Sequence, residues 1–483
     1  MLSLPTRLSA LLLLAGLSLA ACAVDDGAPS NCEGKCDSAD DDAPSKDPAA
    51  FLASVEGLSV REEGSEHRNY RRFIIEFEQP LDHAEDDGRT FRQRIILHHR
   101  DSSRPFVLYT SGYQLFSDDF LAELSVGLDA NQISVEQRFF GTSITENAQS
   151  ADWEHVRIAQ AAADHHRIVL ALKPFYTASW LSTGHSKGGM TSIFHRRFYP
   201  EDVDATVAYV TPISFALPDD RYHAFFDSVS NAACRENIRA LQNRFLELRD
   251  DIQVELEDFA FDETNTFERF GGLDVAIEDG IVWFPWIFFQ SNNVDDCSEL
   301  PDAAIADDFD IVDYFFSSVS VQDDFSIEES IAYTFQAAAE LGYPSVPSAH
   351  LSEQLLFSDV EVDRLPTNVT SPSYSANSMI DVETWVREHG NQILFVYGSA
   401  DPWIAGAYNH GDSSSDDKLT LVANRANHHA LLKDLSIANR QRALNAIERW
   451  VGVEPMLATD DSSRLVPPSL GKESRLSNRS YVK

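Results

Sequence analysis

The sequence predicts a protein of the α/β class, with a mostly parallel sheet and a long helical insertion. Two observations carry this prediction. Short apolar runs alternate with glycine-rich turns and helical spacing before residue 215 and again after residue 386. Between them, residues 216–385 are acidic and mostly helical in pattern. The chain has 483 residues, 43% hydrophobic and 11% aromatic, so it can bury the core that such a fold requires.

The strands expected before the insertion are short apolar segments bounded by turn residues. They are Arg72–Phe77, Gln93–His98, Pro105–Thr110, Asn131–Val135, Trp180–Thr183 and Ala205–Val210. Apolar residues at helical spacing predict helices over Trp153–Leu172 and Gly189–Phe198. The order of strand, glycine-rich turn, helix and strand is typical of a parallel, doubly wound sheet.

The insertion, residues 216–385, is expected to contain several helices. One long amphipathic helix is indicated by apolar residues at helical spacing, namely Ile238, Leu241, Phe245, Leu248 and Ile252. An aromatic block at 281–290 and a helix at 327–341 follow. We expect this segment to form a cap over an active site.

The α/β pattern returns after the insertion. Strands are expected at Gln392–Tyr397 and Leu419–Ala423, and a closing helix at Ile437–Trp450. We therefore expect one α/β domain in two parts, residues 51–215 and 386–455, followed by a loose tail at 456–483.

The charge balance excludes one large class of function. The chain has 38 Lys and Arg residues against 77 Asp and Glu residues, which gives a formal net charge of −39. This field repels phosphate backbones, so we expect no nucleic-acid partner, and it also disfavours docking on anionic lipid through protein charge. The sequence indicates no cofactor, no metal and no obligate protein partner.

The N-terminus predicts export from a bacterial cytoplasm. Residues 1–21 contain one cation, Arg7, then an apolar run that is too short to span a bilayer, which is the order of a signal peptide. Leu19-Ala20-Ala21-Cys22 resembles the lipobox, in which the cysteine is acylated. Ordinary signal cleavage is the alternative. Residues 22–50 are acidic and rich in Ser, Ala and Pro, and we expect a tether that holds the enzyme at the cell envelope, lipid-anchored or secreted.

Four further cysteines fit an oxidising compartment. Cys32 and Cys36 lie in the tether, and a local disulfide is a better interpretation than a metal site, because no second cysteine pair or histidine accompanies them. Cys234 and Cys297 are a candidate second disulfide within the insertion.

The segment Gly184-His185-Ser186-Lys187-Gly188 has the pattern G-x-S-x-G. Such glycines permit a sharp turn between a strand and a helix, which exposes the Ser186 hydroxyl at the edge of the sheet. The helix that begins at Lys187 would direct free backbone N–H groups at a developing oxyanion. Ser186 is therefore the candidate nucleophile of a hydrolase.

A serine nucleophile requires a base and an orienting carboxylate, which should follow later strands in the order acid, then histidine. Asp401 follows the strand at 392–397, and His428 follows the strand at 419–423. His429 is the alternative base. The alternative acids, Asp412, Asp416 and Asp417, lie in a Ser/Asp-rich loop that we expect to be solvated. The spacing predicts a triad of Ser186, Asp401 and His428.

Around these residues the chain resembles the PS-10 tripeptidyl aminopeptidases, serine peptidase family S37. The matching segments are Phe77-Glu78-Gln79-Pro80-Leu81-Asp82-His83, Glu136-Gln137-Arg138-Phe139-Phe140, Gly184 to Thr191, Arg196-Arg197-Phe198-Tyr199-Pro200, Val207 to Val210, Asp401-Pro402-Trp403 and Asn427-His428. Where the family reads E-H-R-F-F this chain has Gln137, and His185 stands where small residues are usual. The resemblance covers about residues 68–452.

The resemblance implies an α/β-hydrolase fold, with the cap inserted between nucleophile and acid, and a secreted exopeptidase that acts on peptides. It implies the same triad. We expect an oxyanion hole made by the backbone N–H of Lys187 and one from the Ser111-Gly112-Tyr113 turn, with Tyr113 preferred over Gly112. An aminopeptidase must also hold a free α-ammonium, and Glu136 is the candidate; the alternative for Glu136 is a structural ion pair with Arg138.

Three functions remain open from the residues alone. The first is a tripeptidyl, dipeptidyl or prolyl aminopeptidase that forms an acyl-enzyme. The same triad would also serve a carboxylesterase or lipase, and a catalytically silent binding lipoprotein could keep the fold. The aromatic block is either core of the cap or an apolar wall for a proline-like residue; its members are Trp283, Phe284, Trp286, Phe288 and Phe289.

Overall fold

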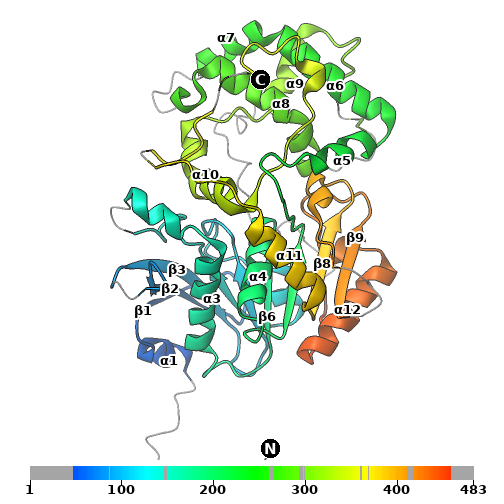
Figure 1. Cartoon of the computed structure of the whole chain (residues 1–483). Coiled ribbons are helices and arrows are strands. Elements are labelled where there is room, and N and C mark those ends of the chain that lie inside the picture. The colour runs from blue at the N-terminus through cyan, green and yellow to red at the C-terminus, as the bar shows by residue number, and fades with distance from the viewer. Residues whose placement is uncertain are drawn as a thin grey trace, which may run out of the picture. The chain divides into compact units, whose positions relative to one another are not determined.

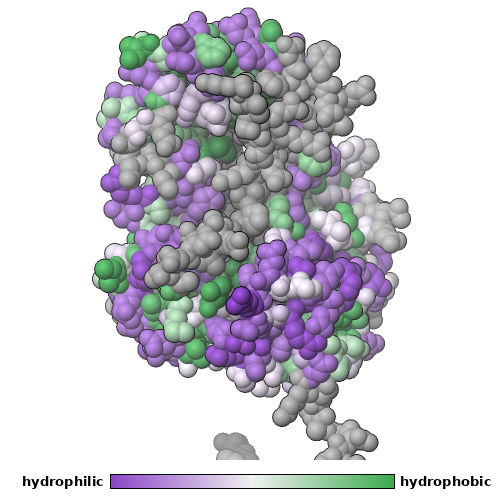
Figure 2. Space-filling view, turned by 180° about the vertical axis from the view of Figure 1, so that it is seen from behind, coloured by the Kyte–Doolittle hydropathy of each residue, from purple (hydrophilic) through white to green (hydrophobic). Residues whose placement is uncertain are grey.

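The computed structural model describes residues 47–457, apart from short gaps at 86–87, 146–148, 260–265, 293–296, 299, 359, 361, 368 and 411–416. The signal segment, Cys22, Cys32, Cys36, most of the tether, the residues after 457, Asp412 and Asp416 lie outside the described residues. Among the helices that the structure describes, none is both long and apolar enough to cross a membrane. The face drawn in Figure 2 is largely hydrophilic, with apolar residues scattered between polar ones.

The described part of the chain is built on one sheet of nine strands (Figure 1). The strands are β1 (Leu58–Glu63), β2 (Arg71–Pro80), β3 (Thr90–His99), β4 (Phe106–Thr110), β5 (Asn131–Val135), β6 (Trp180–His185), β7 (Ala205–Tyr209), β8 (Ile393–Gly398) and β9 (Lys418–Ala423). Their order across the sheet is β1-β2-β3-β5-β4-β6-β7-β8-β9. The first three strands are antiparallel, and the pairs from β5 to β9 are parallel. Parallel strands place their carboxyl ends at one edge of the sheet.

Helices cover both faces of the sheet, which explains why its central strands are buried throughout. Along β8, Leu394 and Val396 face a core that α2 (Glu123–Gly127) and α12 (Ile437–Val451) complete. The alternate residues of β8 face a second core, which contains apolar side chains of α3 (Ile158–Leu172), α4 (Lys187–Phe198) and α11 (Asn377–Glu388). The remaining helix of this part is α1 (Pro48–Ser54), before β1.

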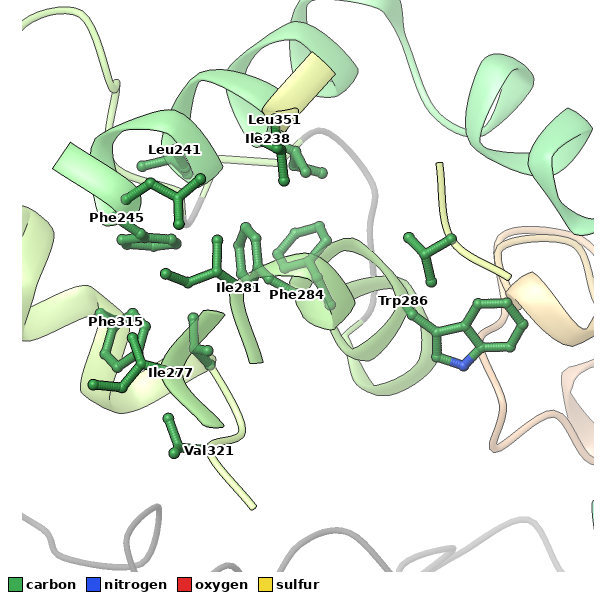
Figure 3. Close-up of a cluster of buried hydrophobic side chains, with 14 of the residues drawn as sticks. Ile238, Leu241, Phe245, Ile277, Ile281, Phe284, Trp286, Phe315, Val321 and Leu351 are labelled. Atoms are coloured by element: carbon green, nitrogen blue, oxygen red, sulfur yellow. The ribbon is translucent and has the colours of Figure 1, made fainter. Parts of the chain in front are cut away.

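A run of helices, here called the helical insertion, lies in the chain between β7 and β8. Its helices are α5 (His223–Ser228), α6 (Ala232–Glu247), α7 (Arg249–Phe259), α8 (Leu273–Ser291), α9 (Asp308–Ser318) and α10 (Asp324–Gln336). They pack around a hydrophobic core of their own, shown in part in Figure 3, where Phe245, Phe284 and Phe315 lie close together. Cys234 and Cys297 form a disulfide, as the sequence predicts, and so join α6 to the segment after α8.

One prediction about this insertion needs correction. The single long helix expected to contain Ile238 to Ile252 is two helices, because the backbone at Leu248 (φ −99°, ψ 18°) leaves helical geometry. Leu248 and Ile252 are nevertheless both buried, so the apolar spacing reflects a core shared by two helices and does not require one continuous helix.

The aromatic block is part of α8, which contains Pro285 within the helix. Residue 385, the expected end of the insertion, lies inside α11.

Candidate active site

Ser186 occupies the turn between β6 and α4. Its backbone has φ 55° and ψ −124°, a conformation that non-glycine residues rarely adopt. The turn is held by hydrogen bonds on either side: the Ser186 N–H donates to the Tyr209 carbonyl at 2.9 Å, and the Met190 N–H donates to the Ser186 carbonyl at 3.0 Å. Such strain is expected where a strand must turn abruptly into a helix and present a nucleophile.

The glycines of this turn are required by close backbone contacts. A Cβ atom on Gly184 would collide with the backbone of Gly188, and one on Gly188 would collide with the carbonyl oxygen of Thr110. On Gly189 it would collide with the Thr211 hydroxyl. The helix after Ser186 therefore begins pressed against β4, a position that only glycine allows.

Asp401 and His428 meet at the carboxyl edge of the sheet. The loops that follow β8 and β9 are joined by a backbone bond from Ala400 N–H to Ala426 O at 2.9 Å. His428 Nδ1 lies 2.7 Å from Asp401 Oδ2, and the Asp401 side chain is fully buried. A second Asp401 oxygen accepts from the Trp403 N–H at 3.1 Å, so the carboxylate is fixed in orientation.

The structure also discriminates among the alternative acid and base. Asp417 lies at the opposite end of β8, where its carbonyl accepts from Ile393 N–H at 3.0 Å. The Asp401 carboxylate accepts its hydrogen bond from His428 Nδ1, which favours His428 over His429 as the base. Their catalytic roles, with that of Ser186, are taken up under the proposed function.

The predicted oxyanion turn lies against the nucleophile turn. Gly112 has φ 75°, and a Cβ atom there would lie 2.7 Å from the Lys187 carbonyl carbon, so the two backbones touch. The Tyr113 N–H donates to Ser111 Oγ at 3.3 Å. The first N–H groups of a helix, including that of Lys187, have no acceptor within the helix. The choice between Gly112 and Tyr113 stays a prediction.

The side chain of Lys187 contributes a contact that sequence reasoning missed, because only its backbone was considered. Its ammonium donates to the Gly112 carbonyl at 2.6 Å and lies over the rings of Tyr113 and Phe140, at 5.4 and 5.0 Å from their centroids. Burial lowers the pKa of Lys187 to about 7. This buried amine joins the two turns that would hold an oxyanion.

His185 is the unusual neighbour of the nucleophile. Its ring stacks on that of Tyr209, with centroids 4.5 Å apart and an interplanar angle of 6°. Burial, together with the nearby His428 and His429, lowers the pKa of His185 to about 3. It is therefore uncharged at neutral pH and packs on Tyr209.

Glu136 lies in a closed network. Its buried carboxylate accepts from Leu115 N–H at 3.0 Å, from Thr142 N–H at 2.9 Å and from Ser143 Oγ at 2.9 Å. The alternative for Glu136, an ion pair with Arg138, is wrong: Arg138 makes two bonds of 2.7 Å to Asp164, and Arg94 lies 3.6 Å from Glu136. The donors around Glu136 hold the loops after β4 and β5, and its role in binding an α-ammonium stays a prediction.

The aromatic block belongs to the core of the helical insertion, and its part in an apolar wall for substrate stays a prediction. Phe284, Phe288 and Phe289 are buried in that core. Trp286 is buried in the same core and also packs on Trp403, with centroids 4.8 Å apart; in Figure 3 it lies apart from the other labelled side chains. The Trp403 ring is in turn 6.0 Å from that of His428. One end of α8 therefore lies beside the candidate base.

One group of side chains among the described residues has the proximity of metal ligands. Ligand atoms of His67, His98 and Asp119 all lie within 4.8 Å of one another. Asp119 already accepts from His98 Nε2 at 2.8 Å and from Ser65 Oγ at 2.8 Å. Because the carboxylate is satisfied by protein donors, a hydrogen-bonded cluster explains this group without an ion.

The chain is similar to several known proteins. The chain is 34% identical over 432 residues to a prolyl tri/tetrapeptidyl aminopeptidase of Streptomyces mobaraensis, covering 88% of this chain and 89% of that protein. The solved structures that it matches include a peroxisomal α/β-hydrolase of Saccharomyces cerevisiae, with 9% identity, TM-score 0.36 and coverage of 82% of this chain and 95% of that one. Another is an α/β-fold hydrolase of Bacillus anthracis, with 13% identity, TM-score 0.33 and coverage of 80% and 99%.

The chain therefore has the α/β-hydrolase fold that the sequence predicts, with a mostly parallel sheet and Ser186 at the strand-to-helix turn. The family model for PS-10 peptidase S37 matches residues 43–482. The protein belongs to the PS-10 peptidase S37 family and is a serine peptidase.

Proposed function

We propose that the protein is an aminopeptidase that removes short peptides from the N-terminus of peptide substrates, with Ser186, Asp401 and His428 as its triad. The observation that carries this proposal is the 2.7 Å contact between His428 Nδ1 and Asp401 Oδ2 at the sheet edge where the strained Ser186 turn also lies. The name of the Streptomyces mobaraensis relative supports the kind of peptide released.

The reaction follows from the positions of these groups. Ser186 Oγ attacks the carbonyl carbon of the scissile bond while His428 Nε2 accepts its proton. The carbon–nitrogen bond then breaks, and His428 returns the proton to the leaving amine, which leaves an ester on Ser186. Water, activated by the same histidine, hydrolyses that ester. Asp401 holds the imidazole orientation and stabilises its charge.

The oxyanion of each tetrahedral intermediate would be stabilised by the backbone N–H of Lys187 and by one from the Gly112–Tyr113 turn. The bond from Lys187 Nζ to the Gly112 carbonyl supports this assignment, because it keeps the two donors at a fixed separation. The net charge of −39 favours the approach of a substrate with a free α-ammonium.

We also propose that the protein is exported and anchored through Cys22. The support is the signal-like order of residues 1–21 and the resemblance to a lipobox. Expression with an alkyne-labelled fatty acid should label the wild type and not a Cys22→Ala variant. A wild type that is not labelled would contradict the lipid anchor and favour ordinary cleavage of the signal peptide.

The test of the enzymatic proposal compares two substrates. A protein lacking residues 1–22 is assayed with Ala-Ala-Pro-p-nitroanilide carrying either a free or a succinylated amino end. We expect cleavage of the free form, and loss of at least about 1,000-fold in kcat for Ser186→Ala with unchanged folding. Equal cleavage of both substrates would contradict an aminopeptidase. Turnover of p-nitrophenyl acetate alone would favour an esterase.

A further inference from the structure

Gln290 lies in the last turn of α8 and contacts both loops that carry the acid and the base. Its side-chain oxygen accepts hydrogen bonds from two indoles, Trp286 Nε1 and Trp403 Nε1, each at 2.8 Å. Its backbone carbonyl accepts from the His428 N–H at 3.2 Å. That carbonyl is free to do so because the last carbonyls of a helix have no partner within it.

The two loops need such a connection because each carries one member of the acid–base pair. Trp403 belongs to the loop of Asp401, whose carboxylate accepts from the Trp403 N–H at 3.1 Å. His428 belongs to the loop after β9. A shift of either loop by a fraction of an ångström would change the distance from the imidazole to the serine hydroxyl, on which proton transfer depends steeply.

The chemistry of glutamine suits this position. An indole N–H can only donate, and an amide oxygen has two lone pairs, so one Gln290 oxygen satisfies both tryptophans. Trp286 is buried, so its indole N–H would otherwise be left without an acceptor. The arrangement thus fixes the Trp403 ring 6.0 Å from the His428 ring.

We propose that Gln290 is a positioning residue of the peptidase reaction, through which the helical insertion holds the acid loop and the base loop at their working separation. The inference rests on the proposed triad. Gln290 touches no reacting atom in this role, and it acts through Trp403 and His428.

The experiment compares three variants of the full chain. Gln290→Met keeps the length of the side chain and removes the acceptor, so we expect kcat to fall about tenfold while KM changes less than about twofold. Gln290→Glu keeps an acceptor for both indoles and should recover most of kcat. The rate at which a fluorophosphonate labels Ser186 is measured for each protein alongside peptide cleavage.

Gln242→Met is the matched control. Gln242 also lies in the helical insertion, where its amide donates to the Ile281 carbonyl at 2.8 Å and accepts from His350 at 3.0 Å, and the structure gives it no bond to either loop. It should lower thermal stability and leave kcat and the labelling rate unchanged. That result would separate positioning from a general loss of packing.

Several outcomes would overturn the proposal: a wild-type labelling rate in Gln290→Met, an equal loss in Gln290→Met and Gln242→Met, or no recovery in Gln290→Glu. Failure of the proposed function has a different signature, in which the wild type is labelled at Ser186 but cleaves no peptide. The labelling rates of the variants would still test Gln290 in that case.

Discussion

The Lys187 ammonium donates a hydrogen bond to the Gly112 carbonyl, 2.6 Å away, and so ties the helix after Ser186 to the turn after β4. Lys187 is 2% exposed, and the Tyr113 and Phe140 rings lie beside its amine. Because the amine is buried in such surroundings, the free energy of unfolding should rise as the pH rises and Lys187 loses its proton.

Lys187→Met should remove a pH-dependent part of the stability. Burial lowers the pKa of Lys187 from 10.5 to about 7 in the folded state. Below about pH 7 both states hold the proton, and the folded state bears the full cost of the buried charge. Above that pH the folded protein releases the proton while the unfolded chain keeps it, so stability rises until about pH 10.

The free energy of unfolding of the wild type, minus that of Lys187→Met, should therefore rise by up to about 1.4 kcal/mol per pH unit across this window. Urea unfolding of both proteins at several pH values measures the difference. A difference that is flat with pH would show that Lys187 keeps its ordinary pKa.

Asp401→Asn should abolish most activity without unfolding the protein. Asparagine keeps an oxygen for the Trp403 N–H but favours the wrong tautomer of His428, so kcat should fall by about 10⁴-fold. The measurement is kcat together with circular dichroism and the thermal midpoint. Activity within tenfold of the wild type would remove Asp401 from the triad.

Gly188→Ala should prevent the turn at Ser186 from forming. The added methyl group would meet the Thr110 carbonyl, which belongs to a central strand and cannot move aside. We expect the free energy of unfolding to fall by about 3 kcal/mol, with little activity left. Gly64→Ala is the control, because no atom lies within 4 Å of the added carbon; similar losses in both would contradict a steric cause.

Cys234→Ser should destabilise the helical insertion. The disulfide to Cys297 closes a sequence separation of 63 residues, and opening such a loop costs about 4 kcal/mol in the chain-entropy description. Urea unfolding followed by tryptophan fluorescence should show that the insertion unfolds at a lower urea concentration in the variant than in the wild type. Reductant should lower the stability of the wild type and leave the variant unaffected; an equal response of both would mean that the bridge adds nothing.

Much of the fold was predictable because its signals are local. The apolar run of β5 and the glycines around Ser186 determine the backbone over only a few residues. The sequence therefore predicts both the exact bounds of β5, Asn131–Val135, and the position of the turn at Ser186. Asp401 and His428 were predictable for a related reason: parallel neighbouring strands end at the same edge, so the loops after them must be close.

Other features could be decided only by tertiary packing. The helix ends at Leu248 although the apolar spacing continues to Ile252. The alternative ion pair between Glu136 and Arg138 does not form, because Arg138 binds the buried Asp164 instead. The bond between Gln290 and Trp403 and the bond between Lys187 and Gly112 have no local pattern, since these partners are 113 and 75 residues apart in the sequence. The sequence by itself determined the α/β architecture, the nucleophile turn and the order of acid and base, because short-range sterics and strand periodicity encode them. The pairing of buried polar groups was decided by the folded structure, because each such group must find an acceptor or donor among whatever residues packing brings beside it.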